Sequence, residues 1–228
     1  PYSVCGGLQD NYSWCGPSRK TGGAITNHDW FTISGGDGFV TQQDPRDPNI
    51  VYSESQGGRI GRSNLATGER ESVARPDWQE VYRARQDSIA LLWPDSTQPM
   101  PAEHADRIAA LQERATADSL SLQLRFNWNT PFFLSSHNPD VVYIGSNRVL
   151  KSSNRGDDVE PISPDLSRQD QEKIRISTEE TGGITPDITG AETFATIVSL
   201  AESPVQQGLL YAGTDDGNLW MSPDDGET

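Results

Sequence analysis

The sequence predicts an all-β fold: part of a β-propeller, with about three to four four-stranded blades and a helical-hairpin insertion. Three observations support this prediction: a turn-rich composition, a strand–turn–strand pattern that recurs, and a hairpin-turn motif in register with that pattern. The 228 residues include 21 Gly and 15 Pro, so turns separate many short elements, which favours sheets over a helical bundle. We interpret 1–228 as one partial propeller domain with insertions at 76–124 and 167–192.

The recurring pattern begins with two apolar residues and a Tyr. A turn of small, polar and Gly residues follows, and then a short run of β-favouring residues that ends in Ser. Its copies contain Tyr52, Tyr143 and Tyr211, and a partial copy covers 2–14. Each copy predicts a hairpin, with the Tyr strand second and the Ser strand third in its blade. Stretches 38–43, 129–135 and 194–200 are the expected innermost strands. The copies are further apart than one blade of about 40–50 residues, which leaves room for the insertions.

A second motif follows the Ser strands. Residues 222–228 match Ser-x-Asp-x-Gly-x-Thr, the Asp-box, and a degraded copy occupies 152–158. The Asp can accept backbone N–H bonds and the Gly supplies a positive φ, so the motif folds a hairpin and is not itself catalytic. The expected structural residues are Ser222, Asp224, Gly226, Thr228, Ser152, Asn154 and Gly156.

These features, together with segments 6–11, 35–38, 44–48, 125–131, 162–166, 201–204 and 210–217, carry a family resemblance. The chain resembles the BNR/Asp-box propellers of the sortilin-N-terminal and xyloglucanase-like group, large exported bacterial proteins usually labelled "glycosyl hydrolase, BNR repeat". The resemblance covers most of the chain apart from about 76–124. It implies a secreted or periplasmic location and a longer parent protein, so we expect the chain to start and stop within blades.

Cys5 and Cys15 suit facing positions on a tight hairpin, where a disulfide would join two strands. Two free buried thiols are the alternative. A metal or redox role has no support, because neither a C-x-x-C spacing nor partner ligands are present. A disulfide would favour an exported protein.

Polar residues of the predicted inter-strand loops are expected to ring one mouth of the propeller channel. Asp37 and Asp10 are the candidate acid/base pair for glycoside hydrolysis, which needs two carboxylates. The candidate ligand-binding residues are Gln9, Asn11, Glu54, Asn127, Trp128, Asn129 and Asp215. Two simpler interpretations stay open: Asp10 and Asp215 organise turns, and Trp128 packs in the core rather than stacking on a sugar.

The insertion at 76–124 shows helical periodicity over 78–93 and 102–124, interrupted by Pro94, Pro99 and Pro101. A helical hairpin beside the mouth would be a lid, a docking element or a cover for an exposed edge. The insertion at 167–192 is charged, then rich in Gly and Thr, which predicts a loop.

Composition excludes several functions. A net charge of −15 repels phosphate backbones, so nucleic-acid binding is not expected. No apolar run approaches the roughly 20 residues of a membrane span. His28, His104 and His137 show no zinc spacing, and no cofactor or metal is expected.

Three functions remain. The first is a non-catalytic module that binds a protein or glycan, the second a xyloglucanase-like glycoside hydrolase, and the third an accessory subunit of a periplasmic assembly. Open blade edges invite aggregation, so we expect the rest of a longer chain or another subunit to cover them.

Overall fold

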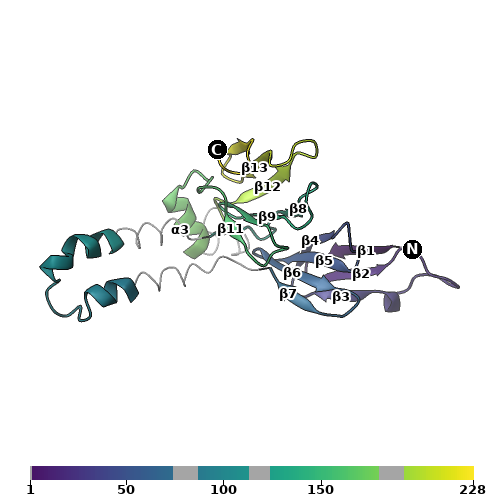
Figure 1. The fold of residues 1–228 in the computed structure, drawn as a ribbon. Helices are drawn as coiled ribbons and strands as arrows, with labels where there is room; N and C mark the ends of the chain where they lie inside the picture. Colours follow the sequence, from purple (N-terminus) through teal and green to yellow (C-terminus); the bar gives the residue numbers. More distant parts are fainter. Residues whose placement is uncertain (1, 74–86, 113–123, 180–192) are drawn as a thin grey trace. The chain divides into compact units, whose positions relative to one another are not determined.

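The computed structural model describes residues 2–73, 87–112, 124–179 and 193–228 (Figure 1). The fold is mostly β, with four antiparallel sheets of three or four strands and few helices. The chain divides into two compact units. One unit is Pro76–Leu124, and the other contains the remaining residues and all four sheets.

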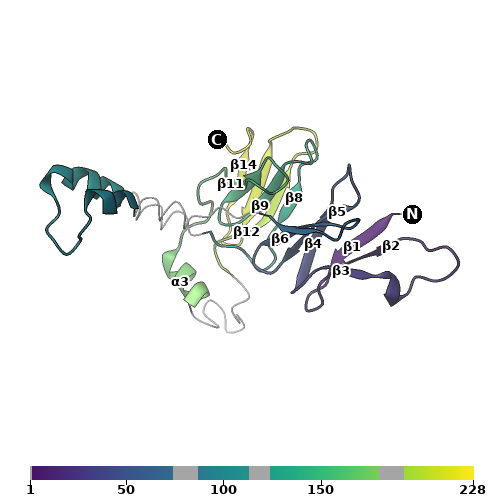
Figure 2. The same cartoon turned by 60° about the horizontal axis from the view of Figure 1, so that its bottom comes forward.

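The sheets follow one another in chain order (Figures 1 and 2). The first sheet has the order β1 (Ser3–Gly7), β2 (Ser13–Pro17), β3 (Phe31–Ser34). The second has β4 (Gly38–Gln43), β5 (Ile50–Ser55), β6 (Arg59–Asn64), β7 (Arg70–Ser72). The third has β8 (Phe132–Leu134), β9 (Val142–Gly145), β10 (Val149–Ser152), β11 (Glu160–Pro161). The fourth has β12 (Ile197–Glu202), β13 (Leu210–Thr214), β14 (Leu219–Ser222).

The three strands expected to be innermost each lie at one side of their sheet, next to the Tyr strand. Strand β4 has the predicted bounds, 38–43. The predicted strands 129–135 and 194–200 correspond to β8 and β12, and both of their predicted ends are wrong. Strand β8 starts only at Phe132, because Thr130 folds back on the Asn127 carbonyl and Pro131 has no N–H to donate. Strand β12 starts only at Ile197, because Ala195 has a positive φ of 64°.

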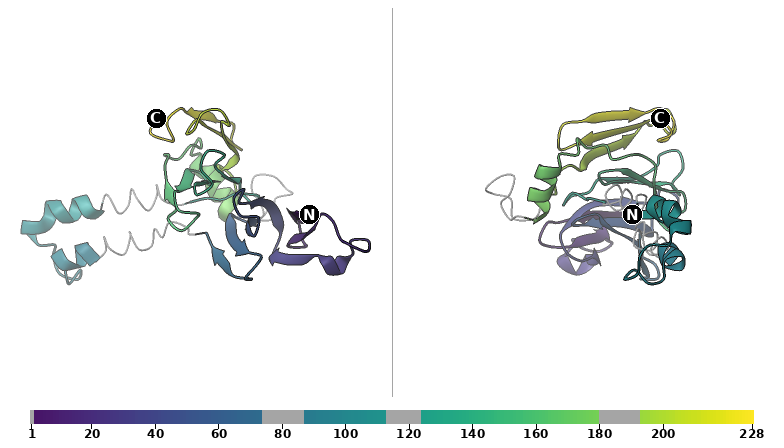
Figure 3. Two further views of the ribbon diagram at one scale, coloured as in Figure 1. Left: turned by 45° about the vertical axis from the view of Figure 1, so that its right-hand side comes forward. Right: turned by 90° about the vertical axis from the view of Figure 1, so that its left-hand side faces the viewer.

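The core lies between sheets, because successive residues of a strand face opposite sides. Val51 of β5 packs with Cys15 and Ile33 of the first sheet, whereas the neighbouring Tyr52 reaches the third sheet. Both Val51 and Tyr52 are 0 % exposed. Between the third and fourth sheets a larger cluster forms; its buried members are Val141, Tyr143, Val149, Leu166, Ile197, Leu210 and Ala212. Figure 3 shows the first and fourth sheets at opposite ends of this series.

The prediction of a loop over 167–192 is wrong for its first part, which contains helix α3 (Gln171–Glu179). The local cause is Asp170, whose carboxylate accepts the Lys173 amide and whose carbonyl accepts the Ile174 amide at the start of the helix. Ile174 and Ser177 are buried, so the helix also packs one face. Residues 180–192 of the predicted loop lie outside the described residues.

In the unit Pro76–Leu124, residues 87–92 and 105–112 are α-helical, and a 3₁₀ turn covers Ala102–His104. Residues 78–86 and 113–123 of the two predicted helices lie outside the described residues. The first helix ends one residue before Trp93-Pro94, and the 3₁₀ turn begins directly after Pro101. Among the described helices, none has the length and apolar character that a membrane crossing requires.

Candidate functional site

The proposed acid/base pair, Asp10 and Asp37, lies where the β1–β2 loop meets the start of β4. The Asp37 carboxylate accepts the backbone N–H of Asp10 at 2.9 Å, and the Asp37 N–H donates to Oε1 of Gln56 at 2.8 Å. Asp10 itself has a φ of 61°, the left-handed conformation that Asp tolerates in turns. Asp37 therefore fixes the shape of the loop, with one of its oxygens bound to backbone rather than directed at a ligand.

Glu54 is the most deeply buried of the candidate residues, with 0 % of its surface exposed on β5. Its Oε1 accepts the N–H groups of Gly58 and Thr130, each at 3.3 Å. The first bond closes the β5–β6 turn and the second reaches the loop before β8. A carboxylate in this position joins the second and third sheets, because hydrogen bonds from two backbone amides offset part of its desolvation.

Asn127, Trp128 and Asn129 form the turn that precedes β8. The Trp128 carbonyl accepts the Gly57 N–H at 3.0 Å, and the Asn127 side chain donates to Oγ1 of Thr196 at 3.2 Å. Trp128 is half-buried and Asn129 is exposed. This turn thus connects the second, third and fourth sheets and still presents Asn129 to solvent.

Asp215 belongs to the β13–β14 turn, and its Oδ1 accepts the Thr196 N–H at 2.9 Å. The Asp215 N–H in turn donates to the Thr196 carbonyl at 3.0 Å. Burial raises the pKa of the Asp215 carboxyl, against the opposing effect of the bond from the Thr196 amide, and the Asp216 carboxylate raises it further. A raised pKa is the direction that a general acid needs.

The candidate residues therefore gather on connected loops of all four sheets, and most of them bind backbone. Gln9 and Asn11 are exposed at the tip of the β1–β2 loop. Asn11 holds this tip through its backbone, since its N–H donates to Leu8 and its carbonyl accepts Nε1 of Trp14 at 2.6 Å. We call this set of loops, 8–12, 36–38, 54–58, 127–130, 196 and 214–218, the loop edge.

The predicted Asp-box residues form two turns of the same design. In each turn the Ser hydroxyl accepts the N–H of the Gly four residues later. The distance is 2.8 Å both for Ser152 with Gly156 and for Ser222 with Gly226. Asp224 accepts both the N–H and the hydroxyl of Thr228. In the degraded copy Asn154 does not take this role; Asp158 instead accepts the Ser152 hydroxyl and two backbone amides.

The fourth position of each turn makes a contact that the sequence analysis missed. Arg155 and Asp225 both have positive φ values, 58° and 62°. The hydroxyl of Tyr52 donates to the Arg155 carbonyl at 3.1 Å, and the hydroxyl of Tyr143 donates to Oδ1 of Asp225 at 2.7 Å. In both cases the Tyr of one sheet reaches the turn of the following sheet. The regular recurrence of Tyr was the available signal, but periodicity does not reveal which neighbour a side chain meets.

A basic side chain accompanies each of these Tyr residues. Arg62 is the cross-strand partner of Tyr52 and donates to the Arg155 carbonyl at 2.7 Å. Lys151 is the cross-strand partner of Tyr143 and forms an ion pair with Asp225. The sheets are thus joined twice by a Tyr and a cation that converge on one turn residue.

Cys5 and Cys15 occupy facing positions on β1 and β2 and form a disulfide. Both face the second sheet, since Cys15 is buried against Ile33 and Val51 and Cys5 packs on the same cluster. The bond therefore lies in the interface between the first two sheets.

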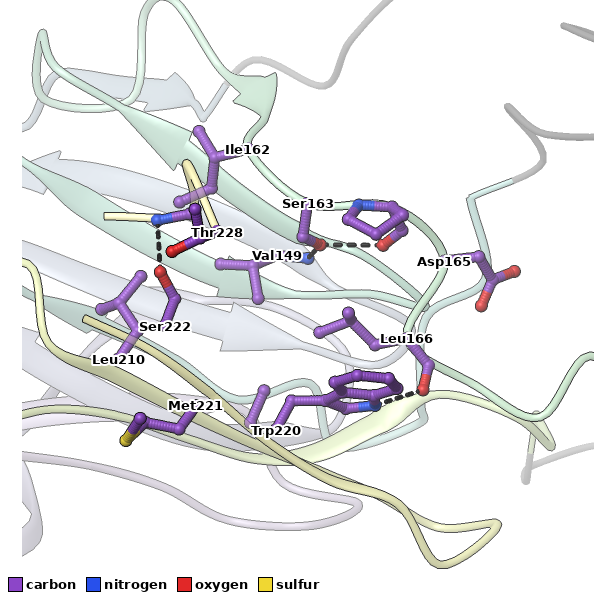
Figure 4. Close-up of a pocket in the computed structure, with 13 residues that line it drawn as sticks. Val149, Ile162, Ser163, Asp165, Leu166, Leu210, Trp220, Met221, Ser222 and Thr228 are labelled. Carbon is purple, nitrogen blue, oxygen red and sulfur yellow. Dashed lines mark hydrogen bonds between the residues drawn. The ribbon is translucent and has the colours of Figure 1, made fainter. Parts of the chain in front are cut away.

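A cavity of about 180 Å³ lies between the third and fourth sheets and is lined by residues of both (Figure 4). Its walls are mostly apolar, and Trp220 closes one side with Nε1 donating to the Leu166 carbonyl at 2.7 Å. Pockets for small-molecule ligands typically measure about 300–1,000 Å³. This cavity is smaller, and it is best understood as imperfect packing between two sheets.

A partly buried ion pair near the loop edge was also missed by the sequence analysis. Arg125 contacts Asp165 at 3.0 Å, Ser167 at 3.1 Å and the Ala195 carbonyl at 3.1 Å. Burial acts to raise the pKa of Asp165, but hydrogen bonds from Ser167 and Asn147 lower it overall. Within the described parts of the chain, no three His, Cys, Asp or Glu side chains are placed to hold a metal ion together.

No family model matches the chain, and no curated protein matches it.

Proposed function

We propose that the chain is part of an exported, non-catalytic β-propeller of the Asp-box kind that binds a protein or a glycan through its loop edge. Four successive antiparallel sheets, each packed on the next, support the interpretation as blades, and a repeated Tyr-to-turn contact joins the last three. The Cys5–Cys15 disulfide is compatible with an exported protein.

The observation that best supports a binding function is that the loop-edge carboxylates hold backbone in place. Asp37, Glu54 and Asp215 each accept backbone N–H groups of a loop on another strand or sheet. Glycoside hydrolysis requires two carboxyl groups free to exchange protons or attack the sugar across a gap of roughly 5–9.5 Å. Carboxylates that hold loops in place instead suit a rigid surface, on which exposed groups such as Gln9 and Asn129 recognise a ligand.

The test combines turnover with binding. The chain is screened against arrays of glycans and peptides, and release of reducing sugar from β-glucans and xyloglucan is measured in parallel. We expect a ligand that binds without being cleaved. The variant Gln9→Ala/Asn129→Ala should weaken binding at least about tenfold, the effect of losing about 1.4 kcal/mol. Val205→Ala, at a side chain 90 % exposed in the β12–β13 loop, serves as the control and should bind normally.

Glycoside hydrolysis is the second candidate, favoured by the raised pKa of Asp215 alone. Sugar release by the wild-type chain that disappears in Asp215→Asn or Asp37→Asn would replace the binding proposal with this one. Equal binding by the Gln9→Ala/Asn129→Ala variant would place the ligand site away from the loop edge.

A further inference from the structure

Tyr12, at the end of the β1–β2 loop, has a backbone conformation that aromatic residues rarely adopt. Its φ is 68°, in the left-handed region where a bulky side chain is strained. In the corresponding turns of the second and fourth sheets, the positive φ values fall on Gly57, Gly58 and Gly217. A Gly would adopt this conformation without strain, so the Tyr at this position carries a cost in stability.

Close backbone contacts fix Tyr12 in this conformation. Its N–H donates to the Gly36 carbonyl at 3.0 Å, and its carbonyl accepts the Leu8 N–H at 2.8 Å. The approach to Gly38 is so close that a Cβ on Gly38 would lie 2.2 Å from the Tyr12 carbonyl oxygen. Because Gly36 and Gly38 belong to the start of the second sheet, Tyr12 lies at the junction of the first two sheets. Strained residues held in this way cluster at ligand-binding sites.

The Tyr12 side chain is available to a ligand. It is 47 % exposed, whereas Tyr52 and Tyr143, whose hydroxyls bind turns of the following sheets, are 0 % and 2 % exposed. The same loop presents two exposed amide side chains, those of Gln9 and Asn11. An aromatic ring beside amide groups offers a ligand an apolar surface together with hydrogen-bond donors and acceptors.

The charge of the loop edge limits the class of ligand. Its residues include no Lys, Arg or His, and five are acidic: Asp10, Asp37, Glu54, Asp215 and Asp216. Such a surface repels ligands that carry carboxylate, sulfate or phosphate groups. A neutral sugar suits it, because the apolar face of the sugar ring can stack on an aromatic side chain while the hydroxyl groups bind amides and carboxylates.

We propose that a neutral glycan stacks on Tyr12 and that Gln9 and Asn11 bind hydroxyl groups of the same sugar. This inference names the ligand class of the loop edge and therefore rests on the proposed function. It gives the strained Tyr a role, since a residue that weakens the fold is retained where recognition needs its side chain.

The test is Tyr12→Gly, which removes the aromatic ring and the backbone strain together. Binding of neutral cello-, xyloglucan- and manno-oligosaccharides is measured by isothermal titration calorimetry, and folding by thermal unfolding. We expect the wild type to bind at least one of these glycans and Tyr12→Gly to bind it about tenfold or more weakly. The melting temperature of the variant should be at or above that of the wild type.

Two further variants serve as controls. Tyr12→Phe keeps the ring and should still bind the glycan. Tyr2→Ala removes an aromatic side chain that is 74 % exposed at the other end of β1, and it should bind as the wild type does.

The outcomes separate this inference from the proposed function. Glycan binding that is equal in Tyr12→Gly overturns the inference and leaves the proposed function in place. A wild type that binds only peptides, or that prefers acidic glycans, also overturns the inference while the loop edge remains a binding surface. A wild type that binds neither glycans nor peptides overturns both.

Discussion

The hydroxyl of Tyr143 on β9 lies 2.7 Å from Oδ1 of Asp225, in the turn that follows β14 of the next sheet. Tyr52 makes the equivalent contact one sheet earlier, with the carbonyl of Arg155. Each of these two turns thus does more than fold its own hairpin, because its fourth residue receives a side chain from the preceding sheet. At Tyr52 and Tyr143 this contact gives a structural reason for the Tyr and the turn to recur in register.

Removing the first of these hydroxyls should measurably destabilise the chain. Tyr52→Phe deletes a buried donor to the Arg155 carbonyl, which typically costs about 0.5–1.5 kcal/mol of unfolding free energy. Tyr2→Phe is the control, because the Tyr2 side chain is 74 % exposed and should change stability little. Chemical denaturation of both variants measures the difference, and equal stabilities would argue against the contact.

The turn glycines offer a second comparison. Gly156 and Gly68 both have positive φ, 100° and 78°, but a Cβ on Gly156 would lie 2.8 Å from Val73, whereas Gly68 faces open space. Both Ala variants therefore carry backbone strain, and only Gly156→Ala also overpacks the interface. We expect Gly156→Ala to lose about 1–3 kcal/mol more than Gly68→Ala. Equal losses in thermal or urea denaturation would show that the turn does not pack on the preceding sheet.

Much of this arrangement follows from sequence patterns, and some of it does not. The recurring strand–turn–strand pattern around Tyr52, Tyr143 and Tyr211 predicts the second and third strands of three sheets, because the sequence signal of a hairpin is local. The partner of each Tyr is non-local and could not be predicted. Helix α3 was missed because its stretch is charged and has few apolar residues, whereas burial of Ile174 and Ser177 supports it in the structure.

In the candidate site, too, local features could be predicted from the sequence and non-local partners could not. One interpretation that the sequence left open is that Asp10 and Asp215 organise turns, and in the structure both residues lie in loops between paired strands. Their hydrogen-bond partners, Asp37 and Thr196, come from other loops, which spacing alone does not reveal. The Arg125–Asp165 ion pair joins residues far apart in the chain and left no motif to find.

Alkaline pH should lower the folding stability of the chain through the ionisation of Tyr143. Burial raises the pKa of this hydroxyl well above its usual value, and the hydrogen bond to the Asp225 carboxylate adds to the effect. Above about pH 10 an unfolded Tyr loses its proton while the folded Tyr143 keeps it, so stability falls as pH rises through this range. Unfolding followed by tyrosinate absorbance should show a weaker alkaline loss in Tyr143→Phe. An unchanged pH dependence would contradict the shift.

Reducing the disulfide should destabilise the interface of the first two sheets. Cys5 and Cys15 are ten residues apart, and closing a loop of that size contributes about 2–3 kcal/mol in the chain-entropy model. Thermal unfolding with and without dithiothreitol measures this effect, and Cys5→Ser/Cys15→Ser should reproduce it without reductant. A melting temperature that does not respond to reductant would mean that the bond contributes no stability.

The central claim is that a Tyr of one sheet is bound to the turn of the next, and a double-mutant cycle of Tyr143 and Asp225 tests it most directly. Unfolding free energies are measured for the wild type, Tyr143→Phe, Asp225→Ala and the double variant. Backbone strain and the loss of the Lys151 ion pair cancel in the cycle, since both variants that carry Asp225→Ala share them. We predict a coupling energy of about 1.5–3 kcal/mol, as for a hydrogen bond to a charged acceptor. Additivity within about 0.3–0.5 kcal/mol would contradict the claim, because residues without direct contact behave in that way.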